Sequence, residues 1–495
     1  MLLSHALRVQ RRRISSLYLG LGALLTAVGV TVATTRPLDN DEGVYAYASK
    51  LVGHGRLPYA DFTYPQTPLL PFAYGPWLRA FGESWVGLRM LSVVFTVALG
   101  LLVYRHCSCR FGARFGLLAF ALFASSGAVI GWLPIIKTYA LSTLLLFGAY
   151  TMVDRRAPTS KAWILGGSLF GLAIGVRALF AAAAPALAVT AGRRARPLGL
   201  LVVGTTIGLL PSLMLFAIAP SASIHDSATL QANRTPSGLI GDFRQKGHIF
   251  LSLFGLRTPD GASGVQFLLL VLAAAAAASA ALALGRRLSA ALPIAICLGL
   301  ASLLPTPTFV QYFCTTYPFL IVCVIEGLAL VGGLFRQDPR ARRALQALAA
   351  APLAFYLAGG LLDLHRYGLF ARGGRDDSIS LAEQVTSALD ARSRPGEDVV
   401  SWWPGYFLGS HATSAAGSLP VSNTGSRVEL LLRTRRVHLI VYKQWLDTTS
   451  TRPWESEFVR DGYRLVTTVG TAKIYALRRR GWRAGRSLRF ERARL

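Results

Sequence analysis

Residues 36–75 read RPLDNDEGVYAYASKLVGHGRLPYADFTYPQTPLLPFAYG, directly after the first strongly apolar segment of the chain. This stretch groups acids with tyrosines: Asp39, Asp41, Glu42 and Asp61 with, among others, Tyr45 and Tyr64. Carboxylates beside a membrane segment are costly unless they lie in water or in a functional site. The stretch therefore predicts a functional face at the end of a first membrane span.

The composition supports a membrane protein. Of the 495 residues, 53% are hydrophobic and only 15% are charged, whereas soluble domains carry about 25% charged residues. The mean hydropathy is +0.44. A chain this long and apolar is typical of a polytopic membrane protein, with the lipid bilayer as its partner.

The basic charge of the chain has two interpretations. A formal net charge of +28 can indicate nucleic-acid binding. However, most arginines and lysines stand in short clusters between apolar runs, where they orient helices in a bilayer. We therefore expect no nucleic-acid partner.

The five cysteines lie in apolar segments or in an expected inner loop, so a disulfide framework is not expected.

Apolar runs predict about eleven membrane spans, with the N-terminus inside and the C-terminus outside. The runs are 14–34, 85–104, 115–133, 138–153, 198–219, 265–284, 288–304, 309–330 and 344–362, plus two short helices within 162–190 that meet near Arg177. In this arrangement every arginine-rich short loop falls on the inner side, as the positive-inside tendency requires. The first run also resembles a signal peptide, but its length favours a spanning helix.

The fold class expected is a mainly α polytopic membrane protein with a small α/β domain. The membrane domain covers 1–362, with outer loops at 35–84 and 220–263. An extracytoplasmic α/β domain follows over 363–477, with a helix at 380–391, strands at 399–402 and 437–442, and a hairpin of 463–469 with 472–477. The basic tail 478–495 is either disordered or lies on anionic headgroups.

The Asp41–Glu42 pair has two interpretations that can hold together. A carboxylate beside a lipid-lined cavity can act as a general base toward an acceptor hydroxyl, and its neighbour can orient it. The same pair can help to hold a divalent cation that neutralises a phosphate leaving group. Alternatively, Asp39 or Asn40 caps a helix that begins near Asp41.

The pattern DEGVYAYA…LVGHGRLPYADF…PQTPL resembles the first outer loop of the GT-C glycosyltransferases. The most similar branch contains the protein O-mannosyltransferases and the lipid A aminoarabinose transferases. The resemblance is close over 36–75 and loose over the rest of the chain. It implies an enzyme of the bacterial cytoplasmic membrane that takes a sugar from a polyprenyl-phosphate donor at the outer face. Transfer to an acceptor hydroxyl would invert the anomeric configuration.

The resemblance also assigns roles to residues. Asp41 would be the general base and Glu42 its partner, with Asp39 as a substitute for the base. Asp61, Tyr45 and Tyr64 would support the site. The leaving phosphate needs positive or hydrogen-bonding donors, and the candidates are Arg177, Lys137, His225, Arg234 and Tyr312. Arg177 interrupts an apolar stretch, which indicates either a functional site or a side chain that reaches the interface.

Two other classes of protein compete with the enzyme. A transporter or flippase of a lipid-linked glycan would place charges and broken helices near the middle of the membrane, often with internal repeats. A membrane scaffold would explain the C-terminal domain but gives the acidic stretch no role. The ionisable residues concentrate in outer loops and no clear repeat is visible, which favours the enzyme. The sugar, the acceptor (glycan, lipid or protein) and any dependence on a metal stay open.

Overall fold

The computed structural model describes residues 2–155, 157–192, 194–229, 238–256, 261–286, 288–335, 337–364, 378–415, 417, 434, 437–443 and 460–478. The chain divides into two compact units, Met1–Ile379 and Ser380–Leu495, and each is described by itself. Of the residues predicted to bind phosphate, Arg234 lies outside the described residues, as does nearly all of the basic tail.

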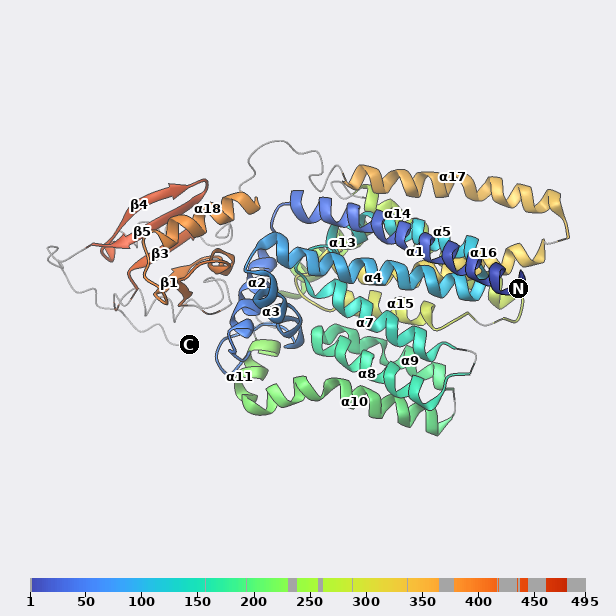
Figure 1. Cartoon of the computed structure of the whole chain (residues 1–495), viewed down its shortest axis with the longest axis horizontal. Helices are drawn as coiled ribbons and strands as arrows, with labels where there is room; N and C mark the ends of the chain where they lie inside the picture. Colours follow the sequence, from blue (N-terminus) through green and yellow to red (C-terminus); the bar gives the residue numbers. More distant parts are fainter. Residues whose placement is uncertain are drawn as a thin grey trace. The chain divides into compact units, whose positions relative to one another are not determined.

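The first unit is a bundle of apolar helices (Figure 1). They are α1 (Leu2–Thr35), α4 (Trp85–Phe111), α5 (Ala113–Ala124), α6 (Gly127–Trp132), α7 (Thr138–Val153), α8 (Ser160–Val176), α9 (Ala184–Ala191), α10 (Ala195–Ile218), α14 (Gly261–Ala283), α15 (Ala291–Ser302), α16 (Tyr317–Leu334) and α17 (Pro339–Leu364). Within the described residues, five helical segments are long and apolar enough to cross a membrane, and shorter apolar helices accompany them. The predicted mainly α polytopic fold is confirmed.

The predicted pair of short helices within 162–190 is also confirmed. α8 ends at Val176, and the 3₁₀ turn η1 (Ala178–Ala183) leads into α9. Arg177 stands at the break with an extended backbone. The chain therefore changes direction at the residue that interrupts the apolar stretch.

The stretch that follows α1 is helical. It contains α2 (Asn40–Gly53) and α3 (Leu69–Phe81), which lie at one end of the bundle (Figure 1). The Asp39 carboxylate accepts a hydrogen bond from the Asp41 backbone N–H, and the Glu42 carboxylate accepts one from the Asp39 N–H. This reciprocal capping satisfies the exposed N–H groups at the helix start. The sequence predicts a cap at Asp39 or Asn40, and in the structure Asp39 is the capping residue.

The second outer segment is also helical where it is described. It contains α11 (Pro220–Ile224), the π-helical turn η2 (His225–Thr229) and α13 (Gly238–Leu253). The turn returns to the first segment, because the carboxylate of Asp226 accepts a 2.9 Å hydrogen bond from the backbone N–H of Tyr64. A buried carboxylate thus joins the two predicted outer loops.

The run predicted to span 115–133 is interrupted at Ser125 and Ser126, between α5 and α6. The buried side chain of Gln266 on α14 bridges the interruption: its amide donates to the Ser125 carbonyl at 2.8 Å and accepts from the Gly127 N–H at 2.7 Å. Backbone groups at a helix break must be paired within a membrane domain. The bridge holds α6 and the segment after it, 133–137, in place.

The second unit is a small α/β domain. It contains α18 (Ile379–Asp390), the 3₁₀ turn η5 (Pro404–Phe407), and strands β1 (Asp398–Ser401), β2 (Thr413–Ser414), β3 (Leu439–Lys443), β4 (Tyr463–Val469) and β5 (Ala472–Leu477). The sheet order is β2-β1-β3-β5-β4. β1 pairs in parallel with β2 and β3, whereas β5 pairs antiparallel with β3 and β4. The predicted β4–β5 hairpin is confirmed.

Glycines set the contact between α8 and α10. A methyl group on Gly208 of α10 would lie 2.1 Å from the Ser168 carbonyl oxygen of α8, and one on Gly204 would lie 2.1 Å from the Ile164 carbonyl oxygen. Small residues let membrane helices approach backbone to backbone. The two helices could not keep this separation with larger residues.

We therefore expect Gly208→Ala to destabilise the bundle by about 1–3 kcal/mol, because the added methyl group forces α8 and α10 apart. Gly199→Ala on the same helix is the control, since nothing lies within 4 Å of the added methyl group. Equilibrium unfolding in mixed detergent micelles measures both variants. Equal stability of the two would contradict the close contact.

Candidate functional site

A buried ion pair between Glu42 of α2 and Arg89 of α4 anchors the end of the bundle. Both side chains are 0% exposed. Arg89 Nη2 lies 2.6 Å from Glu42 Oε1, and Nε lies 2.8 Å from Oε2, which is a bidentate geometry. The guanidinium also donates to the carbonyl oxygens of Ala33, Arg36 and Pro37, at 3.0, 2.8 and 3.1 Å. The pair therefore ties the end of α1, the start of α2 and α4 together.

Glu42 has no capacity for a further ligand. In addition to Arg89, its Oε1 accepts from the Asp39 N–H at 2.9 Å and its Oε2 from the Ile136 N–H at 3.2 Å. Each carboxylate oxygen accepts about two hydrogen bonds. Burial alone would raise the pKa of Glu42, but the Arg89 guanidinium outweighs burial and holds that pKa below its usual value. Glu42 is thus a charged residue that positions the site.

Lys137 joins this end of the bundle to the acids of α2. Its side chain is 2% exposed, and Nζ lies 2.6 Å from Asp39 Oδ1 and 2.9 Å from Asp41 Oδ2. Burial alone would lower the pKa of Lys137, but the two carboxylates outweigh burial and hold that pKa well above its usual value. The Asp41 side chain is 53% exposed. Asp41 is therefore open to a substrate while it is held by a buried cation.

A divalent cation, which the sequence leaves open, does not fit these carboxylates as they stand. The Lys137 ammonium occupies the position between Asp39 and Asp41, and Glu42 is turned to Arg89. In the part of the chain that is described, His, Cys, Asp and Glu side chains form no group of three or more that could hold a metal ion. We derive no catalytic step through a metal.

Arg177 lies between two aromatic rings. Its Cζ is 4.9 Å from the ring centre of Tyr139 on α7 and 4.9 Å from that of Tyr312, which belongs to the 3₁₀ turn η3 (Val310–Thr316). Nη1 donates to Thr138 Oγ1 at 3.0 Å. Although Arg177 is buried, it forms no ion pair with any acid among the described residues. Among the described residues, hydroxyl and π groups contact its charge.

Buried cations and aromatic rings alternate across the site. Arg36 Cζ lies 4.1 Å from the ring centre of Trp132, and Lys137 Nζ lies 5.2 Å from the same ring. Lys137 Nζ also lies 6.0 Å from the ring centre of Tyr139, and Arg177 Cζ lies 4.9 Å from the same ring centre. We call the resulting series the cation–aromatic row: Arg36, Trp132, Lys137, Tyr139, Arg177 and Tyr312. Stacked rings stabilise cations by about 0.5–2 kcal/mol each when desolvated.

The two predicted supporting tyrosines, Tyr45 and Tyr64, pack against each other. Tyr45 of α2 and Tyr64 pack edge to face, with ring centres 6.5 Å apart. The Tyr64 hydroxyl is buried and has no hydrogen-bond partner among the described residues. Burial raises the pKa of Asp226, which accepts from the Tyr64 N–H, although that hydrogen bond partly offsets the effect of burial. An unpaired buried hydroxyl is a group that a ligand or a water can satisfy.

For two other predicted site residues, Asp61 and His225, no described contact reaches the cation–aromatic row. Asp61 accepts a 2.7 Å hydrogen bond from the Leu57 N–H and so closes its own turn. His225 is exposed at the start of η2. The structure thus brings together Asp39, Asp41, Lys137, Arg177 and Tyr312.

Sequence reasoning missed Arg36, Arg89, Trp132, Tyr139 and Asp226. A signal existed for Arg89, because it interrupts an apolar run in the same way as Arg177 does. The aromatic residues carry no such signal, since rings are common in membrane helices.

Comparisons with solved structures show that this fold is shared. Over 93% of this chain and 97% of the other, the structure is similar to ArnT from Cupriavidus metallidurans bound to undecaprenyl phosphate, with a TM-score of 0.60 and 14% sequence identity. The apo state of that ArnT gives a TM-score of 0.58 at 13% identity, covering 94% of this chain and 98% of the other. No protein-family model and no curated protein matches the sequence.

A second similar structure is the Archaeoglobus fulgidus oligosaccharyltransferase in complex with Zn and sulfate. It has a TM-score of 0.52 and 13% identity, over 92% of this chain and 73% of the other. ArnT, which is a lipid A aminoarabinose transferase, and the oligosaccharyltransferase are both GT-C glycosyltransferases. The GT-C fold that the 36–75 stretch predicts is therefore confirmed.

We expect Glu42→Gln to destabilise the protein by about 3–5 kcal/mol, because it leaves the Arg89 charge buried without a counter-ion. Glu83→Gln is the matched control, since Glu83 pairs with Lys50 at 2.9 Å where both side chains are partly exposed. Exposed pairs contribute about 0–1 kcal/mol. Unfolding in mixed micelles compares the two variants, and a similar loss in both would rule out the anchoring role of Glu42.

Proposed function

We propose that the protein transfers a sugar from a polyprenyl-phosphate donor to an acceptor hydroxyl at the outer face of a bacterial cytoplasmic membrane. The site lies at the end of the bundle that carries α2 and α3. Loop charge assigns that end to the outer side, because the short arginine-rich loops lie at the other end.

The observation that carries this proposal is the charge of Arg177. A buried cation without a carboxylate partner is costly, and the described contacts of Arg177 are the Thr138 hydroxyl and the rings of Tyr139 and Tyr312. A phosphate oxygen would supply the missing counter-charge. The similar ArnT structure holds undecaprenyl phosphate, which supports a lipid phosphate as the ligand.

The order of groups along the cation–aromatic row suggests how the roles divide. Asp41 contacts Lys137, Lys137 faces the Tyr139 ring, and Arg177 lies on the Tyr139 ring too. A base thus stands at one side of the row and a phosphate-binding cation further along it. This separation suits a displacement in which the acceptor and the leaving phosphate lie on opposite faces of the sugar.

The reaction balances with these residues. The acceptor oxygen forms a bond to the anomeric carbon, and the bond from that carbon to the phosphate oxygen breaks. Asp41 takes the hydroxyl proton, as a positioned general base does. The phosphate leaves as a monoester with one more negative charge, which Arg177 and Lys137 stabilise. We propose Asp39 as the residue that holds Lys137, with Glu42, Tyr45, Tyr64 and Asp61 supporting the site.

Asp41→Asn is expected to lower kcat by about 10²–10⁴, because the amide cannot accept the proton. Glu83→Gln, which removes a carboxylate from a lysine ion pair at the same end of the bundle, should keep wild-type kcat. Purified protein is assayed for sugar release from polyprenyl-phosphate sugars. Wild-type turnover by Asp41→Asn would reject the base.

Arg177→Gln should weaken binding of the lipid-phosphate product about tenfold or more, since a hydrogen bond to a charged group is lost. Inhibition by added polyprenyl phosphate measures this affinity. Arg56→Gln, at an exposed position between α2 and α3, is the control. Asp41→Asn should leave product affinity nearly unchanged, which separates the two roles. Unaltered inhibition of Arg177→Gln would reject the phosphate site.

A further inference from the structure

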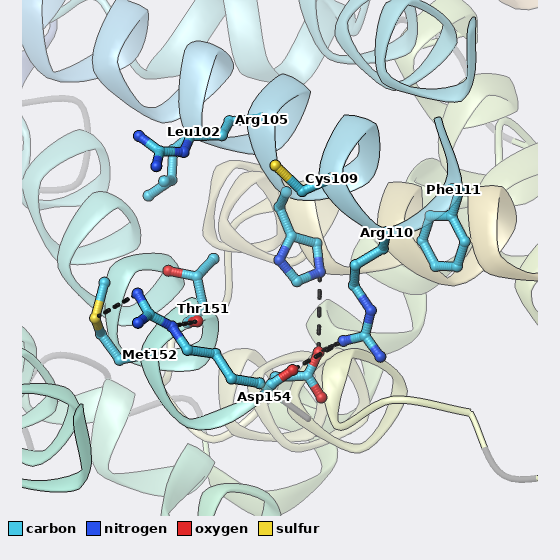
Figure 2. A pocket seen from close by; sticks show the side chains of 10 residues that line it. Leu102, Arg105, Cys109, Arg110, Phe111, Thr151, Met152 and Asp154 are labelled. Atoms are coloured by element: carbon cyan, nitrogen blue, oxygen red, sulfur yellow. Dashed lines mark hydrogen bonds and ion pairs between the residues drawn. The ribbon is translucent and has the colours of Figure 1, made fainter. Parts of the chain in front are cut away.

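A second pocket lies at the opposite end of the bundle, between the C-terminal ends of α4 and α7 (Figure 2). Its volume is ≈ 890 Å³, and Arg105, Arg110 and Arg155 line it together with Leu102, Phe111 and Met152. Along α4, Arg89 and His106 are about 26 Å apart at the α-helical rise per residue. The pocket is therefore separate from the candidate catalytic site, and its size falls within the about 300–1,000 Å³ of ligand sites.

The pocket has more positive than negative charge. Asp154 is the acid that lines it, and it forms an ion pair with Arg110. Within the described residues, Arg105 and Arg155 take part in no ion pair. Arg155 instead donates to the Thr151 carbonyl at 3.4 Å and to the Met152 sulfur at 3.3 Å. Two exposed arginines thus remain for an anion.

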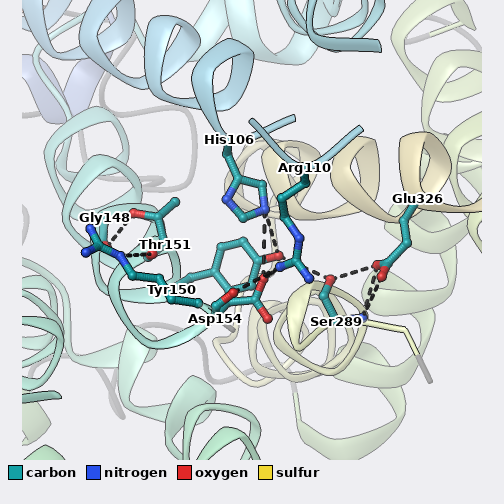
Figure 3. A network of polar contacts seen from close by, with 9 residues as sticks. His106, Arg110, Gly148, Tyr150, Thr151, Asp154, Ser289 and Glu326 are labelled. Atoms are coloured by element: carbon teal, nitrogen blue, oxygen red, sulfur yellow. Dashed lines mark hydrogen bonds and ion pairs between the residues drawn. The ribbon is translucent and has the colours of Figure 1, made fainter. Parts of the chain in front are cut away.

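A polar network around the buried Tyr150 connects His106 and Asp154, in the wall of the pocket, to other helices (Figure 3). His106 Nε2 lies 3.2 Å from the Tyr150 hydroxyl, which donates to Ser289 Oγ at 3.1 Å, and that hydroxyl donates to Glu326 at 2.8 Å. His106 Nε2 also lies 3.9 Å from Asp154 Oδ2. The network joins α4, α7, the segment before α15, and α16. A wall held from several helices is preorganised, so a ligand need not order it on binding.

The lining also suits an amphipathic ligand. Leu102, Phe111 and Met152 are partly exposed apolar side chains beside the arginines (Figure 2). Arg114 at the start of α5 and Arg286 after α14 belong to the arginine-rich connections, which mark the cytoplasmic side of a membrane protein. Anionic lipids give that leaflet its negative surface, and basic pockets between membrane helices can hold their headgroups.

We propose that this pocket binds the phosphate headgroup of an anionic phospholipid of the cytoplasmic leaflet. The phosphate lies between Arg105 and Arg155, and the lipid's apolar part contacts Leu102, Phe111 and Met152. This site is independent of the proposed sugar transfer. Its test therefore measures lipid binding rather than activity, and its failure would leave the proposed function untouched.

Cys109 provides a local readout, because it lines the pocket and is the exposed one among the five cysteines. Full-length protein in a neutral detergent is labelled with a maleimide, and Cys109→Ser identifies the labelled site. Dioleoyl-phosphatidylglycerol is expected to slow labelling, whereas dioleoyl-phosphatidylcholine should not. Inorganic phosphate alone should not slow it either. Equal protection by inorganic phosphate, or none by phosphatidylglycerol, would overturn the lipid assignment.

The variant R105Q/R155Q should bind phosphatidylglycerol about thirtyfold more weakly, as expected for two arginines at an anionic headgroup. The matched control is R114Q/R196Q, which removes the same charge from two exposed arginines that do not line the pocket. The control should keep wild-type protection. If both double variants lose protection equally, the lipid responds to diffuse charge and the pocket assignment is wrong. Unchanged protection of R105Q/R155Q would also reject it.

Discussion

The buried Glu42–Arg89 ion pair is the constraint on which the candidate site depends. Arg89 donates hydrogen bonds to the carbonyl groups at the end of α1. Glu42 accepts hydrogen bonds from the N–H groups at the start of α2 and at Ile136. These contacts fix two segments at once: the one that presents Asp39 and Asp41, and the one that leads to Lys137. A single charge lost from this pair would disturb both the base and the cation that holds it, because the ion pairs of Lys137 with Asp39 and Asp41 join the same two segments.

Much of the fold could be predicted because it depends on local patterns. Apolar run length predicts the spans, Asp39 or Asn40 before the helix predicts the cap, and the two short runs 463–469 and 472–477 predict the β4–β5 hairpin. Arg177 was recognised because an arginine in an apolar run is costly wherever it lies. The break between α5 and α6 was not predicted, since Gln266, which makes the break tolerable, belongs to a helix far along the chain.

The site as a whole could not be predicted for a related reason. Glu42 and Arg89 belong to different helices, and the sequence around either residue does not indicate that the other is its partner. The cation–aromatic row combines residues from the end of α1, α6, α7, the α8–α9 break and η3. Its rings are ordinary core residues in the sequence and gain a role only through their positions beside buried cations. Tertiary packing, rather than local propensity, assembles such a site.

The two ends of the bundle differ in how far their cations are exposed to solvent. At the arginine-rich end the cations are exposed, so water meets part of their charge and they cost little. At the other end Arg36, Lys137 and Arg177 are buried. Arg89 is paired with Glu42, and Lys137 with Asp39 and Asp41, whereas the described partners of Arg177 are neutral. Folding does not favour an unpaired buried charge by itself. Arg177 is therefore where an anion that completes the site would gain most.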